Sequence, residues 1–112
     1  MAAEDGPFTL AFVGWAAPAM AAAASAYEDA VLPLLADHGA RVEYRGLRSL
    51  GQSEDLPVEV HLLWFPSRAA FDAYLADPRR AALLEEHGDV FTRKLVVELD
   101  ESPRSHGGGR AT

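Results

Sequence analysis

The 112-residue chain contains neither cysteine nor asparagine. The absence of cysteine excludes disulfides, thiolate nucleophiles and cysteine-ligated zinc sites. The absence of asparagine excludes any mechanism that depends on the side chain of that residue. Basic residues are also scarce, with 10 Lys and Arg against 17 Asp and Glu and a net charge of −7. Because phosphate binding needs a clustered basic surface, we expect no nucleic-acid partner.

Long hydrophobic runs are missing as well. The alanine-rich stretch 16–26 is interrupted by Pro18, and a membrane-spanning helix needs about 20 apolar residues. Residues 1–7 are acidic, unlike the basic start of a secretory signal. We therefore expect no membrane partner, a cytoplasmic location, and one domain with a modest core.

Several motifs of catalysis and cofactor binding are absent too. The sequence has no phosphate-binding loop, no dinucleotide fingerprint and no Gly-x-Ser-x-Gly elbow. Its four histidines do not follow the i, i+4 spacing of a helical metal site. We therefore predict no metal and no cofactor. His38 and His87 each precede a glycine, and we interpret both as histidines at helix ends, where a cation favours the helix dipole.

What the sequence does contain is a strand that runs directly into a helix. Residues 58–65 are rich in β-branched, aromatic and aliphatic side chains. Ser67 then provides a helix N-cap. An apolar helical face follows, with Ala70, Phe71 and Tyr74 at i, i+3 and i+4 spacing.

The remaining elements complete two strand-helix-strand units. The pattern predicts strands over 8–15, 41–50, 58–65 and 90–99, and helices over 19–37, 67–76 and 78–86. We expect Pro33 to bend the first helix or start a new turn, and Gly39 to end it in a left-handed conformation. The order β-α-β-β-α-β predicts an α+β, ferredoxin-like domain over residues 8–99 with a four-stranded antiparallel sheet. Residues 1–7 and 100–112 are predicted to be flexible tails.

The strands are apolar on both faces, which indicates a partner. With both helices on one side, the other face of such a sheet would be exposed. A second copy of the chain is the simplest cover. We therefore predict a homodimer through the sheet face.

Three features of the sequence are typical of one superfamily. The first is a helix with Ala26, Tyr27, Ala30 and Pro33-Leu34-Leu35, followed by His38-Gly39-Ala40-Arg41. The others are the junction Leu63-Trp-Phe-Pro-Ser67 with Ala69, Ala70 and Phe71, and the break at Asp77-Pro78. On these features the chain resembles the dimeric α+β barrel superfamily over residues 8–99. The most similar group is a small bacterial family of unknown function. Antibiotic-biosynthesis monooxygenases are more distant relatives.

This resemblance implies a homodimer whose two sheets form a barrel, with a small-molecule cavity in each protomer. Members of the superfamily include cofactor-free oxygenases, isomerases and haem-degrading enzymes. The haem-degrading members and some of the oxygenases use a first-strand asparagine, which this chain lacks. The resemblance also implies that Phe65 lines the pocket, and that Tyr27 lies near the cavity mouth.

His61 is the most suggestive single residue for chemistry. It lies in the middle of an apolar predicted strand, two residues after Glu59 and so on the same sheet face. A histidine there could act as a general base, with the carboxylate orienting it. The alternative is a partly buried histidine whose hydrogen bonds are satisfied by a neighbouring strand or the dimer contact.

Aromatic and polar residues could complete a site around this histidine. Trp15 and Phe65 would share its face if the first and third strands are paired in register, and could form aromatic walls for a planar ligand. Trp64 would point the other way and pack under the helices. The alternative for these side chains is core or interface packing.

The second strand supplies further candidates. Arg41, Glu43 and Arg45 would lie on one of its faces, with Tyr44 on the other. Arg45 could hold an anionic substrate, and Tyr44 or Tyr27 could donate a phenolic proton. The alternative for the arginines is a solvated edge or a salt bridge between subunits.

These observations favour a small cofactor-independent enzyme that acts on a planar or polyketide-like molecule. Its reaction would be a cyclisation, an isomerisation or an oxygenation. In this interpretation the catalytic residues are His61, Tyr27 and Tyr44, and the substrate-binding residues are Trp15, Phe65, Arg45 and Glu59. The alternatives are a non-catalytic module that binds a small molecule, and a dimer whose inner face is fully packed.

Overall fold

A four-stranded antiparallel sheet forms the base of the molecule in the computed structural model, which describes residues 6–100. Most of the two predicted tails lies outside the described residues. The strands are β1 (Phe8–Trp15), β2 (Arg41–Leu47), β3 (Glu59–Phe65) and β4 (Arg93–Leu99). Their order in the sheet is β2-β3-β1-β4. The helices are α1 (Ala21–Val31), α2 (Arg68–Leu75) and α3 (Pro78–His87), with 3₁₀ segments η2 (Pro18–Met20) and η3 (Leu32–His38).

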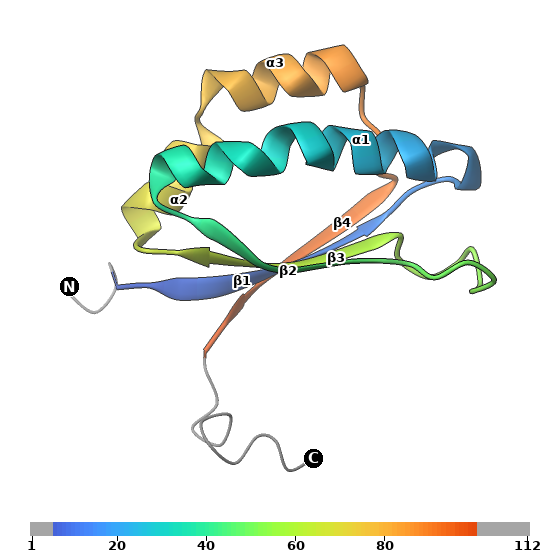
Figure 1. Ribbon diagram of the computed structural model, residues 1–112, viewed down its shortest axis with the longest axis horizontal. Coiled ribbons are helices and arrows are strands. Elements are labelled where there is room, and N and C mark those ends of the chain that lie inside the picture. The colour runs from blue at the N-terminus through green and yellow to red at the C-terminus, as the bar shows by residue number, and fades with distance from the viewer. Residues whose placement is uncertain (1–5, 101–112) are drawn as a thin grey trace, which may run out of the picture.

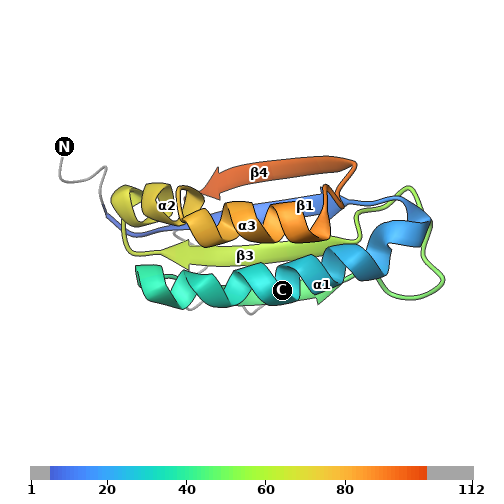
Figure 2. The same ribbon diagram turned by 90° about the horizontal axis from the view of Figure 1, so that it is seen from above.

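All the helices lie on one face of the sheet, and the opposite face of the described domain is bare (Figure 1). Seen from above, α1 and α3 run side by side over the sheet, and β4 lies beyond them at one edge (Figure 2). Every residue of β4 is exposed. The predicted ferredoxin-like order β-α-β-β-α-β is confirmed.

Local sequence explains where the helices begin and end. Ser67 caps α2, since its hydroxyl accepts a hydrogen bond from the Ala70 amide at 3.0 Å. Pro33 cannot supply an amide to the preceding turn, and the first helix tightens from α1 into the 3₁₀ segment η3 at Leu32. Gly39 then ends it with φ of 73°, in the left-handed region as predicted.

The register of the central strands sorts their side chains onto two faces. Phe12 lies opposite His61, and Gly14 lies opposite Glu59. Side chains alternate along a strand, so Trp15 falls on the bare face while His61 faces the helices. The predicted shared face of Trp15 and His61 is therefore wrong. The prediction that Trp64 packs under the helices is also wrong, because Trp64 lies on the bare face.

A β-bulge changes the prediction for β2. The register shifts between Val42 and Tyr44, so that Arg41 pairs with Trp64 but Arg45 pairs with His61. An extra residue in one strand reverses the faces of those beyond it. Arg41 and Arg45 therefore lie on opposite faces, contrary to the alternation expected from sequence.

The core lies between the helices and the covered face of the sheet. Its largest fully buried apolar side chains are those of Val31, Leu35 and Phe65. The bare face is apolar as well, although it is exposed, and its members include Tyr44, Val60, Leu95, Val97 and Leu99. Within residues 6–100, no helix is long and apolar enough to cross a membrane.

Candidate functional site

A cavity of about 110 Å³ lies between the sheet and the helices, and we call it the inner cavity. The sheet contributes Phe12, His61 and Phe65 to its wall, and α1 contributes Tyr27 and Glu28. The rest of the lining is mainly apolar and comprises Leu10, Val31, Leu32, Leu63, Phe71, Tyr74, Leu75, Arg80 and Val96. A dry cavity of roughly 150 Å³ holds a benzene ring, so the inner cavity has the scale of a single ring.

His61 is held in this wall by a chain of ionised groups. Its Nε2 lies 2.7 Å from Oε1 of Glu59. Arg45 donates to the same carboxylate through Nε and Nη2, both at 3.0 Å. Arg45 is fixed in turn by Asp29 at 2.7 Å and by Ser25 on α1. This arrangement fixes the imidazole ring in one orientation.

The charge of Glu59 determines which ring nitrogen of His61 carries the proton. Burial raises the pKa of Glu59, but the hydrogen bonds from His61 and Arg45 outweigh it and hold that pKa below its usual value. An ionised carboxylate only accepts hydrogen bonds, so Nε2 is the protonated nitrogen. In the neutral form of the ring Nδ1 bears the lone pair, and among residues 6–100 the ring is hydrogen-bonded through Nε2. A neutral imidazole of this kind can act as a base.

Glu28 is a second titratable group in the same cavity. Glu28 is only 6% exposed. Burial raises its pKa to about 7, the charge of His61 opposes that rise, and the charge of Glu59 adds to it. Near neutral pH the carboxyl group therefore exists in both protonation states, as a group that gives and takes protons should.

The sequence interpretation missed Glu28, although a signal was present. Ala24, Tyr27 and Val31 form the buried stripe of α1 at helical spacing, and Glu28 falls within that stripe. An acid at a position where the helix pattern demands an apolar residue is a candidate for function.

A second cavity of about 320 Å³ adjoins the first, and we call it the outer cavity. Five residues line both cavities: Phe12, Tyr27, Glu28, Leu75 and Arg80. Asp89 and Lys94 contribute charged side chains to the outer cavity. Together the two spaces extend from His61 towards the α3–β4 side of the molecule.

The structure brings together some of the predicted site residues and separates others. Tyr27 and Phe65 line the inner cavity with His61. Tyr44 does not, because it lies on the bare face of the sheet and is 57% exposed. Trp15 is also on the bare face, where its ring is covered by the guanidinium of Arg93 at 4.5 Å. Neither Trp15 nor Tyr44 can contact a ligand in the inner cavity of its own protomer.

Arg45 and Glu59 do not take the substrate-binding role predicted for them, although Glu59 does contact His61 as the orienting carboxylate expected from the sequence. Both are on the covered face, but they bind each other and lie behind His61. Since the guanidinium of Arg45 already holds Glu59 and Asp29, it is not available for an anionic substrate. The pair orients the histidine instead.

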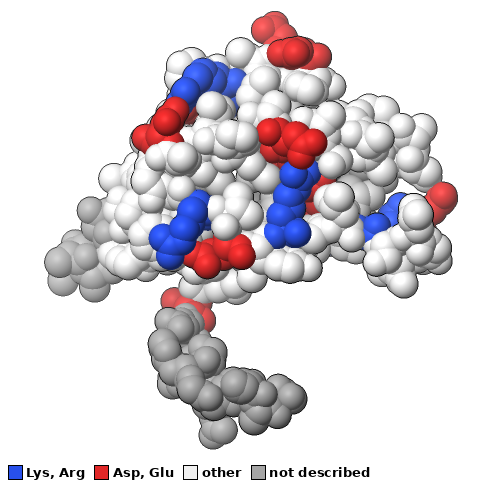
Figure 3. Space-filling model, in the orientation of Figure 1, with Lys and Arg blue, Asp and Glu red and all other residues white. Residues whose placement is uncertain are grey.

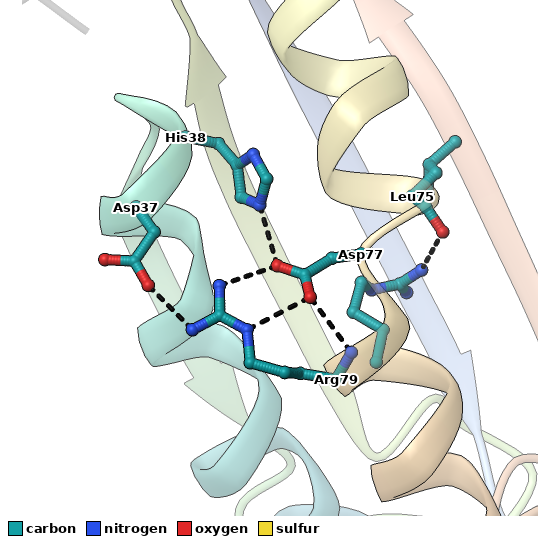
Figure 4. A network of polar contacts seen from close by, with 6 residues as sticks. Asp37, His38, Leu75, Asp77 and Arg79 are labelled. Atoms are coloured by element: carbon teal, nitrogen blue, oxygen red, sulfur yellow. Dashed lines mark hydrogen bonds and ion pairs between the residues drawn. The ribbon is translucent and has the colours of Figure 1, made fainter.

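A separate polar network fixes the start of α3 (Figure 4). Asp77 accepts hydrogen bonds from the Arg79 amide at 2.9 Å and the Arg79 side chain. His38 at the end of η3 lies 2.8 Å from the same carboxylate, and Arg79 also reaches Asp37. Hydrogen bonds from Arg79 and His38 lower the pKa of Asp77. His38 therefore joins η3 to α3 in addition to ending its own helix.

Basic and acidic side chains lie against one another over much of the charged surface. Figure 3 shows blue and red groups in adjacent pairs on an otherwise uncharged face. Ion pairs at the surface include Arg41–Glu43, Arg45–Asp29 and Arg79–Asp37. Within the described residues, no group of three or more His, Asp or Glu side chains could hold a metal ion. The absence of a metal or cofactor in function stays a prediction.

Comparison with known proteins places the fold. No protein-family model matches the chain, and neither does any curated protein. A protein of unknown function from Rhodopseudomonas palustris aligns with a TM-score of 0.69 and 21% identity, over 88% of this chain and 85% of the other. An antibiotic biosynthesis monooxygenase aligns with a TM-score of 0.62 and 15% identity, over 87% and 99%.

A third similar structure is a dimeric ferredoxin-like protein of unknown function from Thermobifida fusca. It aligns with a TM-score of 0.58 and 11% identity, over 86% of this chain and 92% of the other. The group to which the sequence pointed is thus found among the similar structures. At these identities the likeness is one of fold, and this chain has the ferredoxin-like fold that these proteins share.

Proposed function

We propose that this protein binds a small, ring-bearing molecule between its sheet and helices and moves a proton on that molecule, with His61 as the base. The observation that carries the proposal is the buried His61 in the wall of a cavity, held at Nε2 by Glu59, whose carboxylate is held in turn by Arg45. A carboxylate behind an imidazole fixes its tautomer and stabilises the cation formed when the ring takes up a proton.

The proposed step needs no further reactant. Nδ1 of His61 takes a proton from an acidic C–H or O–H of the ligand, and the electron pair stays on the ligand as an enolate or phenolate. Return of a proton to a different atom completes an isomerisation. In a cyclisation the enolate carbon first attacks a carbonyl carbon of the same ligand, and the alkoxide formed by opening of the C=O π bond takes up the proton. Glu28 and Tyr27 line the cavity on the side of α1 and are the candidate donors for this return.

The shape of the wall supports a planar ligand. The ring of Phe12 stacks on His61 with centroids 4.9 Å apart and planes at 25°, and Phe65 lines the same space. Aromatic walls favour flat apolar molecules such as aromatic or polyketide-like intermediates. The likeness to an antibiotic biosynthesis monooxygenase suggests an alternative reaction, in which molecular oxygen reacts with the same enolate or phenolate.

Removal of a proton from 5-nitrobenzisoxazole tests the base directly. In this reaction a base takes the ring C–H proton, the N–O bond breaks, and a coloured nitrocyanophenolate forms. We expect the protein to accelerate the reaction, and His61→Gln to slow it by about 100-fold or more, as is usual for loss of a general base. Tyr44→Phe is the matched control, because Tyr44 lies on the bare face, and it should retain the full rate.

Two outcomes would overturn the proposal. An unchanged rate in His61→Gln would show that another group is the base. Binding of the probe without any acceleration would leave a non-catalytic module that holds a small molecule. Loss of the rate together with loss of probe binding would also count against a role as base, since removal of the base alone should spare binding.

We further propose that the protein is a homodimer through the bare face of the sheet. Val60, Leu95 and Val97 on this face are 37–44% exposed, and contiguous exposed apolar surface marks interaction sites. The similar protein from Thermobifida fusca is described as dimeric and ferredoxin-like. A two-fold pair of sheets would bury this surface against its own copy.

A further inference from the structure

Arg80 differs from the other arginines that lie near carboxylates in the described structure. Four of those form ion pairs: Arg41 with Glu43, Arg45 with Glu59 and Asp29, Arg68 with Glu98, and Arg79 with Asp77 and Asp37. Arg80 forms no ion pair within residues 6–100. Its Nε is buried there without any hydrogen-bond partner. Its Nη1 donates a long hydrogen bond of 3.4 Å to the Leu75 carbonyl, and the side chain also forms a hydrogen bond with that of Tyr74.

The side chain of Arg80 lies between the two cavities. It lines both the inner and the outer cavity, as does Glu28. Its guanidinium carbon lies 4.7 Å from the centre of the Tyr74 ring, which holds the group by a cation–π contact. The hydrogen bonds from Arg79 to the Asp77 carboxylate fix the first turn of α3, which contains Arg80.

A buried donor without a partner is costly, and more so when it carries charge. An oxygen from a ligand would remove this cost, and a negatively charged oxygen would form a short, strong hydrogen bond with the guanidinium. On the side of the inner cavity the wall around Arg80 is mainly apolar, which strengthens such an interaction because the local dielectric is low.

We propose that Arg80 is the anion-binding residue of this site, and that the ligand is an apolar ring system with one enol or phenol oxygen that is ionised when it contacts Arg80. This inference rests on the proposed function in one respect: the base His61, in the same cavity, creates the charge that Arg80 receives. Arg80 thus takes the role that the sequence suggested for Arg45. Groups placed where charge develops in a reaction stabilise its transition state.

Titration calorimetry with a matched pair of probes tests this role. The probes are 4-nitrophenol at pH 8, where it is mainly the anion, and 4-nitrotoluene, which has a similar shape but no acidic oxygen. Arg80→Met keeps an unbranched aliphatic side chain and removes the guanidinium that lies over Tyr74. We expect it to weaken 4-nitrophenolate binding at least tenfold and to change 4-nitrotoluene binding less than twofold.

Lys94→Met is the control, because it removes the same charge from the wall of the outer cavity and should leave both affinities within twofold. Equal loss of both probes in Arg80→Met would mean that the residue only packs, and would overturn the proposal. So would unchanged phenolate binding, or a loss confined to Lys94→Met. Failure of the wild-type protein to prefer the phenolate would overturn it as well.

The test separates this inference from the proposed function. His61→Gln should retain the preference for the phenolate, because the anion is supplied ready-made. If the wild-type protein does not accelerate proton removal but its phenolate preference depends on Arg80, the catalytic proposal fails and the assignment of Arg80 stands. If proton removal depends on His61 but the phenolate preference does not depend on Arg80, the reverse holds.

Discussion

The two faces of the sheet differ from those of an ordinary half-exposed sheet, because both faces are apolar and the titratable side chains of β3 lie on the covered one. On β3 the covered face carries Glu59 and His61, each about 1% exposed. The bare face of the same strand carries Val60, Leu62 and Trp64, which are partly exposed. Antiparallel sheets usually turn apolar residues inward and polar residues to water. Here the strand places Glu59 and His61 inside, beside the buried Leu63 and Phe65, and carries only apolar side chains on the outside.

This arrangement is informative because the buried titratable groups and the exposed apolar surface both cost stability. Buried charges must be paired and hydrogen-bonded, and exposed apolar surface invites association. A chain selected for stability alone would avoid both. The covered face therefore points to chemistry and the bare face to a partner, and variants on the two faces should respond differently.

Glu59→Leu should have the largest effect on the free energy of unfolding. It leaves Arg45 and His61 without their shared carboxylate, and removal of one partner from a buried pair costs about 3–5 kcal/mol. The control on the other face of the same strand is Val60→Ala, which should cost about 1 kcal/mol or less. Urea unfolding at one protein concentration measures both. Equal losses would contradict the contrast between the faces.

Glu28→Gln should stabilise the protein at high pH. The pKa of Glu28 is raised from 4.5 to about 7. Below pH 4.5 the carboxyl group is mainly neutral in both the folded and the unfolded protein, so folding carries little ionisation cost. As the pH rises to about 7 the unfolded chain ionises first, so stability is lost, by about 3 kcal/mol at most. The groups whose charges act on Glu28 are His61, Glu59 and Arg45 from the sheet and Arg80 from α3.

The variant removes this cost, so its advantage over the wild type should grow between pH 4.5 and 7 and then level off. Thermal or urea unfolding at pH 4.5 and pH 8 measures the difference. If the difference in unfolding free energy between the variant and the wild type were the same at both pH values, Glu28 would not be a buried titrating acid.

Leu62→Lys should disrupt association rather than folding. Leu62 lies in the centre of the bare face, opposite Ala11 and Tyr44 on the neighbouring strands. A charge placed there would have to be desolvated in the dimer. We expect the dimer dissociation constant to rise at least 100-fold, about 2.7 kcal/mol, in sedimentation equilibrium. Ala82→Lys, on an exposed position of α3, should leave it unchanged, and a wild-type monomer would refute the interface.

Much of the fold followed from local patterns in the sequence. Ser67, Pro33 and Gly39 each act through their own backbone or side-chain chemistry, and each behaves as predicted. The pairing of Glu59 with His61 was also predictable, because residues two apart on one strand share a face. Assignments that needed only one element were therefore reliable.

The errors arose where two elements had to be aligned. The face of Trp15 depends on the register between β1 and β3, and a shift of one residue reverses every side chain. The face of Arg45 depends on the bulge in β2, for which the alternating pattern of residues 41–47 gave no warning. Glu28 and Arg80 become members of the site only when α1 and α3 are packed over the sheet. No single-segment pattern contains that information.

Alanine substitutions at two glycines, one on each face of the sheet, should have the smallest effects on the free energy of unfolding. A Cβ on Gly14 would lie 2.7 Å from Cε1 of Phe91 and 2.9 Å from Cε2 of Phe12. A Cβ on Gly46 would meet only the ring of Tyr44, at 2.7 Å from its hydroxyl oxygen. The first site is buried on the covered face, whereas Tyr44 is exposed and can swing away.

Gly14→Ala should therefore cost about 1–3 kcal/mol of unfolding free energy, as overpacked cores do, whereas Gly46→Ala should change it by about 0.5 kcal/mol or less. Because the displaced ring of Phe12 stacks on His61, Gly14→Ala should also slow proton removal from 5-nitrobenzisoxazole, and Gly46→Ala should not. If both substitutions left the rate unchanged, the stack of Phe12 on His61 would have no part in positioning the base, and only the chain from Arg45 through Glu59 would remain for that task.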